Sequence, residues 1–185
     1  MTDDNNRQHC RLVWLSALQA FADRDVQEGR WLDKNETNPH FSLVECMCCY
    51  FDDAFLSQDD AYEKRRAAGY VSATEVAAVA EFHALAERYR SPDDDDWNAR
   101  RILGDPKWQA VVQAAQTAQA NLLLITDAAE RKALLEPLVW ESDDGVFKAD
   151  LTGSTITLGV PNQDQFAGNK SSALFRRWFG WLLGR

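Results

Sequence analysis

Short helix-initiating sequences recur along this chain, and each precedes apolar residues spaced at the period of an α-helix. Two of them, Ser72-Ala73-Thr74-Glu75 and Asp127-Ala128-Ala129-Glu130, match the capping box. In that motif the first and fourth side chains bond to free backbone N–H groups at a helix start. Proline follows a capping residue at Asn38-Pro39, Ser91-Pro92 and Asp105-Pro106, which is typical of a first helical turn. Together these signals predict helices over residues 8–27, 39–56, 59–68, 73–90, 92–104, 106–125 and 128–136.

The spacing of apolar side chains also predicts which face of each helix is buried. In the helix over 106–125 the predicted seam consists of Val111, Ala114, Ala115, Ala118, Leu122 and Ile125. In the helix over 39–56 it consists of Leu43, Val44, Met47, Phe51, Ala54 and Phe55. Most neighbours in each set are three or four residues apart, which places them on one side of a helix. We therefore expect these helices to share one core.

The pattern changes after Pro137, where β-branched and apolar residues gather in short runs separated by glycine-containing turns. The runs are Leu138–Glu141, Val146–Leu151 and Ser154–Val160, with turns at Asp144-Gly145 and Thr152-Gly153. The predicted fold class is mainly α (α+β). It is a single domain, 1–185, of about six to seven helices with a small C-terminal antiparallel β meander and a final amphipathic helix over 171–183. A boundary near residue 137 would divide it into 1–136 and 137–185.

Length and charge restrict the partners. A chain of 185 residues, of which 45% are hydrophobic, suits one domain with a sizeable core. The net charge is −9, and residues 1–100 hold 20 acidic and 11 basic residues, whereas 101–185 hold nine of each. Phosphate backbones repel an acidic chain, so we expect no nucleic acid and favour a basic protein partner. With no signal-peptide pattern and no apolar membrane span, a cytoplasmic protein with reduced thiols is predicted.

A cluster of potential metal ligands follows His40. Cys46, Cys49 and Asp53 are spaced so that one side of a helix would carry all three, and His40 precedes them. The same spacing predicts that Cys48 belongs to the buried face, beside Val44, Phe51 and Phe55. No second Cys/His pair is present, although structural zinc sites usually draw ligands from two segments. The ordinary interpretation is packed thiols beside solvated acids, and a metal site is the alternative.

A second candidate is a set of acidic side chains that would bind a basic partner. It comprises Asp52, Asp53, Asp59, Asp60, Asp93, Asp94, Asp95 and Asp96, with Trp97 beside the last four. The run Asp93–Asp96 is predicted to occupy a helix's first turn, where carboxylates meet the positive end of the helix dipole. Trp31 and Trp97 are candidate aromatic anchors, because tryptophan is enriched at binding hot spots.

Two further candidates have less specific patterns. His83 lies at the flank of an apolar face with Glu87 four residues later, an arrangement that suits a general base. Its ordinary interpretation is a histidine hydrogen-bonded within the fold. The predicted helix over 171–183 has apolar side chains over about half of its circumference and carries two arginines. Such a helix packs on its own domain, on a partner or at a membrane surface, and the first is the commonest outcome.

Three hypotheses about function follow. The favoured one is a non-enzymatic, acidic interaction protein that binds a basic protein partner, for example a toxin-neutralising immunity-type or regulatory protein. The alternatives are a metal-dependent or acid–base enzyme using Cys46, Cys49, Asp53 and His40, and a scaffold or membrane-surface protein acting through residues 171–185. No nucleotide-binding loop or nucleophile elbow is present, so no cofactor is expected. We expect a monomer or homodimer.

Overall fold

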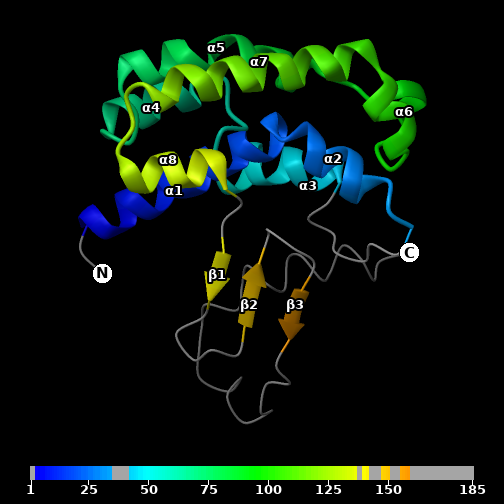
Figure 1. Ribbon diagram of the computed structural model, residues 1–185. Helices are drawn as coiled ribbons and strands as arrows, with labels where there is room; N and C mark the ends of the chain where they lie inside the picture. The colour runs from blue at the N-terminus through cyan, green and yellow to red at the C-terminus, as the bar shows by residue number, and fades with distance from the viewer. Residues whose placement is uncertain (1–2, 35–41, 137–138, 142–146, 151–154, 159–185) are drawn as a thin grey trace, which may run out of the picture. The chain divides into compact units, whose positions relative to one another are not determined.

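The computed structural model describes residues 3–34, 42–136, 139–141, 147–150 and 155–158 (Figure 1). Within these residues the fold is mainly helical, as predicted. The α-helices are α1 (Asp3–Ala22), α2 (Arg24–Trp31), α3 (Leu43–Cys48), α4 (Ala61–Ala67), α5 (Ala73–Arg88), α6 (Ala99–Gly104), α7 (Pro106–Leu123) and α8 (Ala128–Leu135). A π-helical turn, η1 (Cys49–Asp53), continues α3, and a 3₁₀ turn, η2 (Pro92–Asp94), precedes α6.

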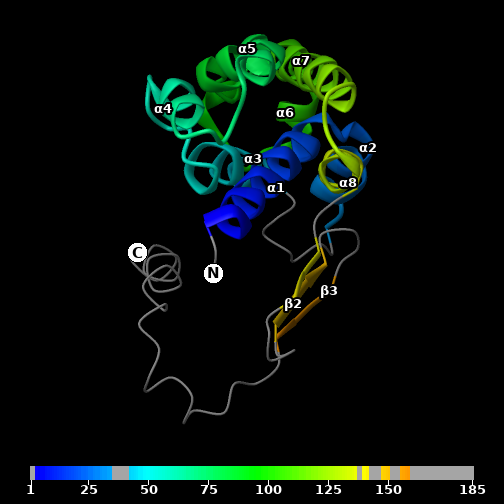
Figure 2. The ribbon, with the colours of Figure 1, turned by 90° about the vertical axis from the view of Figure 1, so that its left-hand side faces the viewer.

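Helix α1 lies among the other helices and contributes the centre of the core. It contacts α7, α8 and η1, and α5 packs along α7 (Figure 2). Its second half is buried on most sides, because Trp14, Leu15, Leu18 and Phe21 are all almost fully covered. A helix that is apolar over most of its circumference fits the interior, and α7, α8, η1, α2 and α3 all pack on it.

Three of the capping signals begin the helices that they predicted. Ser72 and Glu75 form both bonds of a capping box at α5, and Asp127 and Glu130 do the same at α8. Asp105 caps α7, with Pro106 as the first helical residue. In each case a side chain satisfies backbone donors that have no partner inside the helix.

Two predicted helices are divided differently in the structure. The predicted helix over 8–27 is two helices, because Asp23 ends α1 and caps α2 by accepting a hydrogen bond from Val26 N. Gly29, predicted to end that helix, lies inside α2. The predicted helix over 92–104 is also wrong. Only α6, capped by Asn98, is α-helical there, since Asp93 and Asp94 adopt left-handed backbone angles that no helix accommodates.

The segment over 42–56 buries a face that matches the predicted one only in part, since Leu43 and Ala54 belong to both. Leu43, Cys46, Tyr50 and Ala54 are buried, whereas Phe55 is 73% exposed. Cys48, predicted to be in the core, is only half-buried, and Cys46, predicted on the opposite side, is buried. The wider π-helical turn rotates the residues that follow it, such as Phe55, relative to a regular α-helix. Ser42 caps α3, and His40 lies outside the described residues.

The C-terminal part contains β1 (Val139–Glu141), β2 (Phe147–Asp150) and β3 (Thr155–Leu158), hydrogen-bonded in that order in one sheet. The chain divides into two compact units, of which the first comprises Met1–Val139 and Asp150–Thr155 and holds all eight described α-helices. The predicted antiparallel meander, the boundary near residue 137 and the final helix stay predictions. Residues 159–185 lie outside the described part of the chain. Among the described helices, none combines the length and the apolar character needed to cross a membrane.

Candidate functional site

The connection between α5 and α6, residues 91–98, is an acidic loop whose backbone is held by its own side chains. Buried Ser91 donates a hydrogen bond from Oγ to Asp96 Oδ1 at 2.6 Å, and Trp97 N donates to Asp95 Oδ1 at 3.1 Å. Asp93 and Asp94 adopt φ angles of 58° and 55°, a region that aspartate tolerates better than most residues. The loop therefore presents its residues in one defined conformation.

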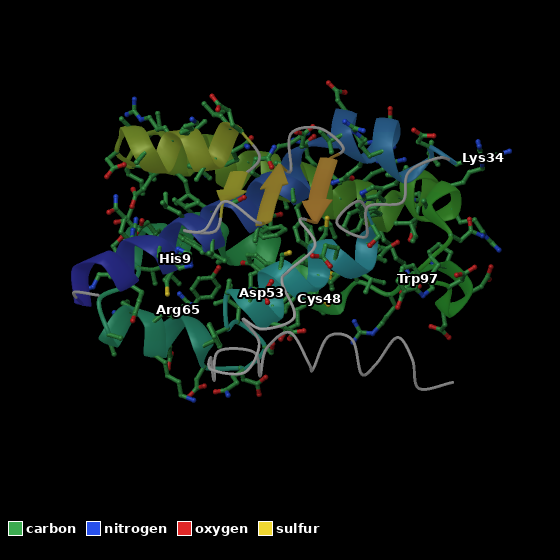
Figure 3. The ribbon with its side chains drawn as sticks, turned by 90° about the horizontal axis from the view of Figure 1, so that it is seen from below. His9, Lys34, Cys48, Asp53, Arg65 and Trp97 are labelled. Atoms are coloured by element: carbon green, nitrogen blue, oxygen red, sulfur yellow. The ribbon has the colours of Figure 1, made fainter. Side chains whose placement is uncertain are left out.

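The loop exposes carboxylates and an indole ring together. All four side chains from Asp93 to Asp96 are exposed, and Trp97 is 71% exposed (Figure 3). Asp93 forms an ion pair with Arg101 of α6, so this carboxylate helps to hold the loop on the helix. Asp94, Asp95 and Trp97 are then the groups of this loop that are best placed to meet another molecule.

The other predicted acidic residues lie elsewhere. Asp52 and Asp53 belong to η1, and Asp59 and Asp60 precede α4. Helices α4 and α6 lie at opposite ends of the paired helices α5 and α7 (Figures 1 and 2). Asp53 is also well separated from Trp97 (Figure 3). The structure therefore divides the predicted partner-binding set between two separate places.

Near α4 the carboxylates have neighbours within the fold. Asp52 Oδ1 accepts a hydrogen bond from Ser57 Oγ at 2.9 Å, and Asp60 pairs with Lys64 at 2.9 Å.

Trp31, the other predicted anchor, is half-buried, and the centroid of its ring lies 5.6 Å from that of Trp108. Trp31 therefore packs against the core, whereas Trp97 is exposed.

The three thiols of α3 and η1 are poorly suited to chemistry that needs a thiolate. Burial raises the pKa of the Cys46 thiol, and burial together with Glu45 raises that of Cys49, whose Sγ lies 3.5 Å from Glu45 Oε1. Burial and the nearby carboxylates raise the pKa of Cys48 to about 11. Nucleophilic and metal-binding cysteines react as thiolates. Among the described residues, no three His, Cys, Asp or Glu side chains are grouped so as to hold a metal ion.

His83 packs in an aromatic cluster that the sequence pattern did not reveal. Its ring centroid lies 5.8 Å from that of Tyr50, 5.5 Å from Phe51 and 5.0 Å from Tyr62. Burial lowers the pKa of His83 despite the nearby Glu87, so the ring is neutral at pH 7, and its buried Nδ1 has no hydrogen-bond partner in the described residues. These contacts make His83 a packing residue.

The same cluster contains a chain of hydrogen bonds. Trp14 Nε1 donates to Tyr62 Oη at 3.0 Å, and the hydroxyls of Tyr62 and Tyr50 lie 2.6 Å apart. Burial raises the pKa of Tyr62 to about 12. The two phenols therefore stay protonated near neutral pH and link α1, η1 and α4.

Arg11 forms a further network that sequence reasoning missed. Its guanidinium donates to Glu75 Oε1 at 2.5 Å, to Glu130 Oε1 at 2.6 Å and to the Tyr70 carbonyl at 2.6 Å. Both glutamates are the fourth residues of capping boxes, so one arginine of α1 joins the starts of α5 and α8. The capping boxes were visible in the sequence, but no local pattern indicates that a residue 64 positions away pairs with Glu75.

Comparison with known proteins assigns no family. No protein-family model matches the chain, and neither the curated proteins nor the solved structures contain a match. The predicted site in residues 171–185 lies outside the described residues. The exposed tryptophan and carboxylates of the acidic loop are therefore the features that bear on function.

Proposed function

We propose that this protein is a non-enzymatic interaction protein that binds a basic protein partner at the acidic loop, residues 91–98. The observation that supports this proposal is Trp97, an indole that is 71% exposed and follows four exposed aspartates. Toxin neutralisation of the immunity-protein type is one concrete form of this function.

We also propose, from the sequence pattern alone, that residues 138–160 form the antiparallel meander and residues 171–183 the final helix.

The two kinds of group would have different roles in binding. Carboxylates such as Asp94 and Asp95 attract a basic surface and speed encounter, an effect that weakens as salt rises. Trp97 supplies a large apolar surface that loses water only in the complex, which is typical of a hot spot. Its flat ring also accepts the cation of a lysine or arginine side chain. The partner expected here therefore carries Lys or Arg beside an apolar contact.

The enzyme hypothesis lacks an equivalent group in the described residues. A thiol nucleophile or thiolate ligand needs a lowered pKa, and the pKa values of Cys46, Cys48 and Cys49 are all raised. His83 is enclosed by aromatic rings rather than paired with a carboxylate. These observations favour the interaction function over acid–base or metal chemistry.

The proposal is tested by affinity purification of a partner from the source cells at low salt, followed by binding kinetics. Trp97→Ala should raise the dissociation rate at least about tenfold, as expected for a hot-spot side chain. Asp94→Asn with Asp95→Asn should mainly slow association, and the difference from wild type should shrink as salt rises. Asparagine tolerates the left-handed backbone of Asp94, so the loop is preserved.

Asp59→Asn is the matched control, because it removes an exposed charge at the other end of α5 and α7. It should leave binding close to that of the wild type. A partner that binds Trp97→Ala and wild type equally, or the absence of any partner at any salt concentration, would show that this function is wrong.

A further inference from the structure

A stripe of apolar side chains runs along the outer side of α3 and η1. We call it the outer stripe, and it consists of Val44, Met47, Cys48, Phe51 and Phe55. The first four are half-buried and Phe55 is 73% exposed. The adjoining side of the same segment, with Leu43, Cys46, Tyr50 and Ala54, is buried in the core, and Met47 and Phe51 also pack against that core. The apolar surface of this segment therefore continues outward from the core and ends in the exposed ring of Phe55.

Phe55 occupies a backbone position that normally belongs to glycine. Its φ angle is 53°, and Phe55 N donates to the Asp52 carbonyl while Leu56 N donates to the Phe51 carbonyl. These two bonds form a Schellman motif, which ends a helix with one left-handed residue. A side chain with a Cβ is strained in that conformation.

Helix α4 also ends in a Schellman motif, and there the left-handed residue is a glycine. Gly69 has a φ angle of 74°, Gly69 N donates to the Arg66 carbonyl, and Tyr70 N donates to the Arg65 carbonyl. The chain thus places glycine at one Schellman position and a large exposed aromatic residue at the other. Phe55 adds backbone strain and buries little surface within the fold, which is the signature of a residue kept for contact with another molecule.

The stripe is also held in place before any partner arrives. Phe51 packs edge-on against the ring of Tyr50, with centroids 5.0 Å apart, and lies 5.5 Å from the ring of His83. The Schellman motif fixes the position of Phe55 relative to Phe51. Because the Phe51 ring and the Phe55 backbone are already held in place, a partner that covers them loses less conformational entropy.

Negative charge surrounds the outer stripe. Asp52 and Asp53 are exposed and lie between Phe51 and Phe55 in the sequence. The carboxylates of Asp52, Glu45 and Asp53 all act on the Cys48 thiol in the middle of the stripe and disfavour its ionisation. A second copy of this chain would bring like charges together across a two-fold axis, and the whole chain has a net charge of −9. A basic surface is complementary to this one.

We propose that the outer stripe docks an amphipathic, basic helical segment of a partner protein, with its apolar side chains on Phe51 and Phe55 and its Lys or Arg side chains beside Asp52 and Asp53. Grooves and faces of this kind bind partner helices through apolar residues three and four positions apart. The stripe is separate from the acidic loop, since Asp53 and Trp97 lie well apart (Figure 3). The inference therefore does not rest on the function proposed for that loop.

The test uses the full chain and a synthetic helical peptide of leucine and lysine, arranged so that the leucines line one face. Binding is followed by isothermal titration calorimetry. A peptide of the same composition in scrambled order and a leucine–glutamate peptide are the controls for amphipathicity and charge. We expect only the amphipathic basic peptide to bind stoichiometrically. Asp52→Asn with Asp53→Asn should weaken it, whereas Asp94→Asn with Asp95→Asn should not.

Phe55→Gly is the decisive variant, because it removes the exposed ring and relieves the backbone strain together. It should weaken peptide binding at least about tenfold and raise Tm by about 2 °C. Equal binding by Phe55→Gly and wild type would overturn the proposal, and so would a fall in Tm. The proposal also fails if only the Asp94→Asn, Asp95→Asn double variant loses peptide binding. It fails as well if sedimentation shows that the chain is a dimer and that Phe55→Gly dissociates it.

Discussion

Helix α7 and the α3–η1 segment have similar apolar periodicity, yet the structure uses them differently. In α7 most of the predicted seam is buried, with Val111, Ala115, Ala118 and Leu122 almost fully covered against α1 and α5. Ile125, predicted at the end of that seam, lies beyond the helix and is 48% exposed. In α3–η1 only Leu43 and Ala54 of the predicted face are fully buried, and the core also takes Cys46 and Tyr50, whereas Phe55 is exposed. Periodicity therefore shows that a helix has an apolar face, but it does not show which neighbour covers that face.

The difference has a structural cause in each helix. Helix α7 has 18 residues of regular α-helix, so its seam keeps one direction over its whole length. Helix α3 has six residues before the π-helical turn begins, and the buried face includes Tyr50, whose hydroxyl bonds to Tyr62 inside the fold. A tyrosine and a cysteine contribute weakly to an apolar pattern, so Tyr50 and Cys46 were not recognised as the core face.

The largest expected effect on stability comes from truncating an apolar side chain to alanine, compared between α7 and the α3–η1 segment. Leu122→Ala removes a fully buried side chain of α7 and should lower the free energy of unfolding by about 2–5 kcal/mol. Met47→Ala on the outer stripe should lower it by less than about 1 kcal/mol, because Met47 is only half-buried. Urea denaturation of both variants checks this. Similar losses at the two positions would show that the outer stripe is part of the core.

A second prediction concerns the ion pairs of Arg11 that join the starts of α5 and α8. Arg11→Met keeps much of the side-chain length but leaves Glu75 and Glu130 without their shared cation, and it should lower the free energy of unfolding by about 3 kcal/mol. Burial opposes ionisation of Glu75, but hydrogen bonds from Arg11 and Ser72 outweigh it and lower the pKa of that carboxyl.

The same network predicts a pH dependence. Since the pKa of Glu75 is lower in the folded chain, its contribution is present above the ordinary value of 4.5 and is lost as pH falls through the folded-state pKa. Urea denaturation at pH 7 and pH 3.5 should therefore show a smaller acid loss for Arg11→Met than for wild type. An equal loss in the two proteins would contradict the role of this pair.

The smallest expected effects on stability come from substitutions at the two Schellman positions, Gly69 and Phe55. Gly69→Ala should lower the free energy of unfolding by about 1–2 kcal/mol, because a residue with a Cβ is strained in the left-handed conformation. The added Cβ would lie 3.5 Å from Arg7, an ordinary contact distance, so no clash adds to this strain. Thermal unfolding should show opposite signs for Gly69→Ala and Phe55→Gly. If both substitutions lower Tm, then the ring of Phe55 stabilises the fold and the comparison between the two positions is wrong.

Much of the helical fold could be predicted because helix starts are local. A capping box needs only four consecutive residues, so Ser72–Glu75 and Asp127–Glu130 were sufficient to place the starts of α5 and α8. The acidic loop shows the limit of such signals. Ser91-Pro92 resembles a helix start, but the left-handed backbone at Asp93 and Asp94 prevents a helix until Asn98. The exposure of Trp97 follows from that change.

The sequence by itself determined the helix-forming segments, their caps and the acidic balance, because each depends on residues close together in the chain or on a sum over it. Only the tertiary structure decided the rest. It placed Arg11 between two capping boxes, separated Asp53 from Trp97, and buried Cys46 instead of Cys48. These outcomes depend on which helix packs against which face, and packing joins residues that are distant in sequence, so no local pattern carries that information.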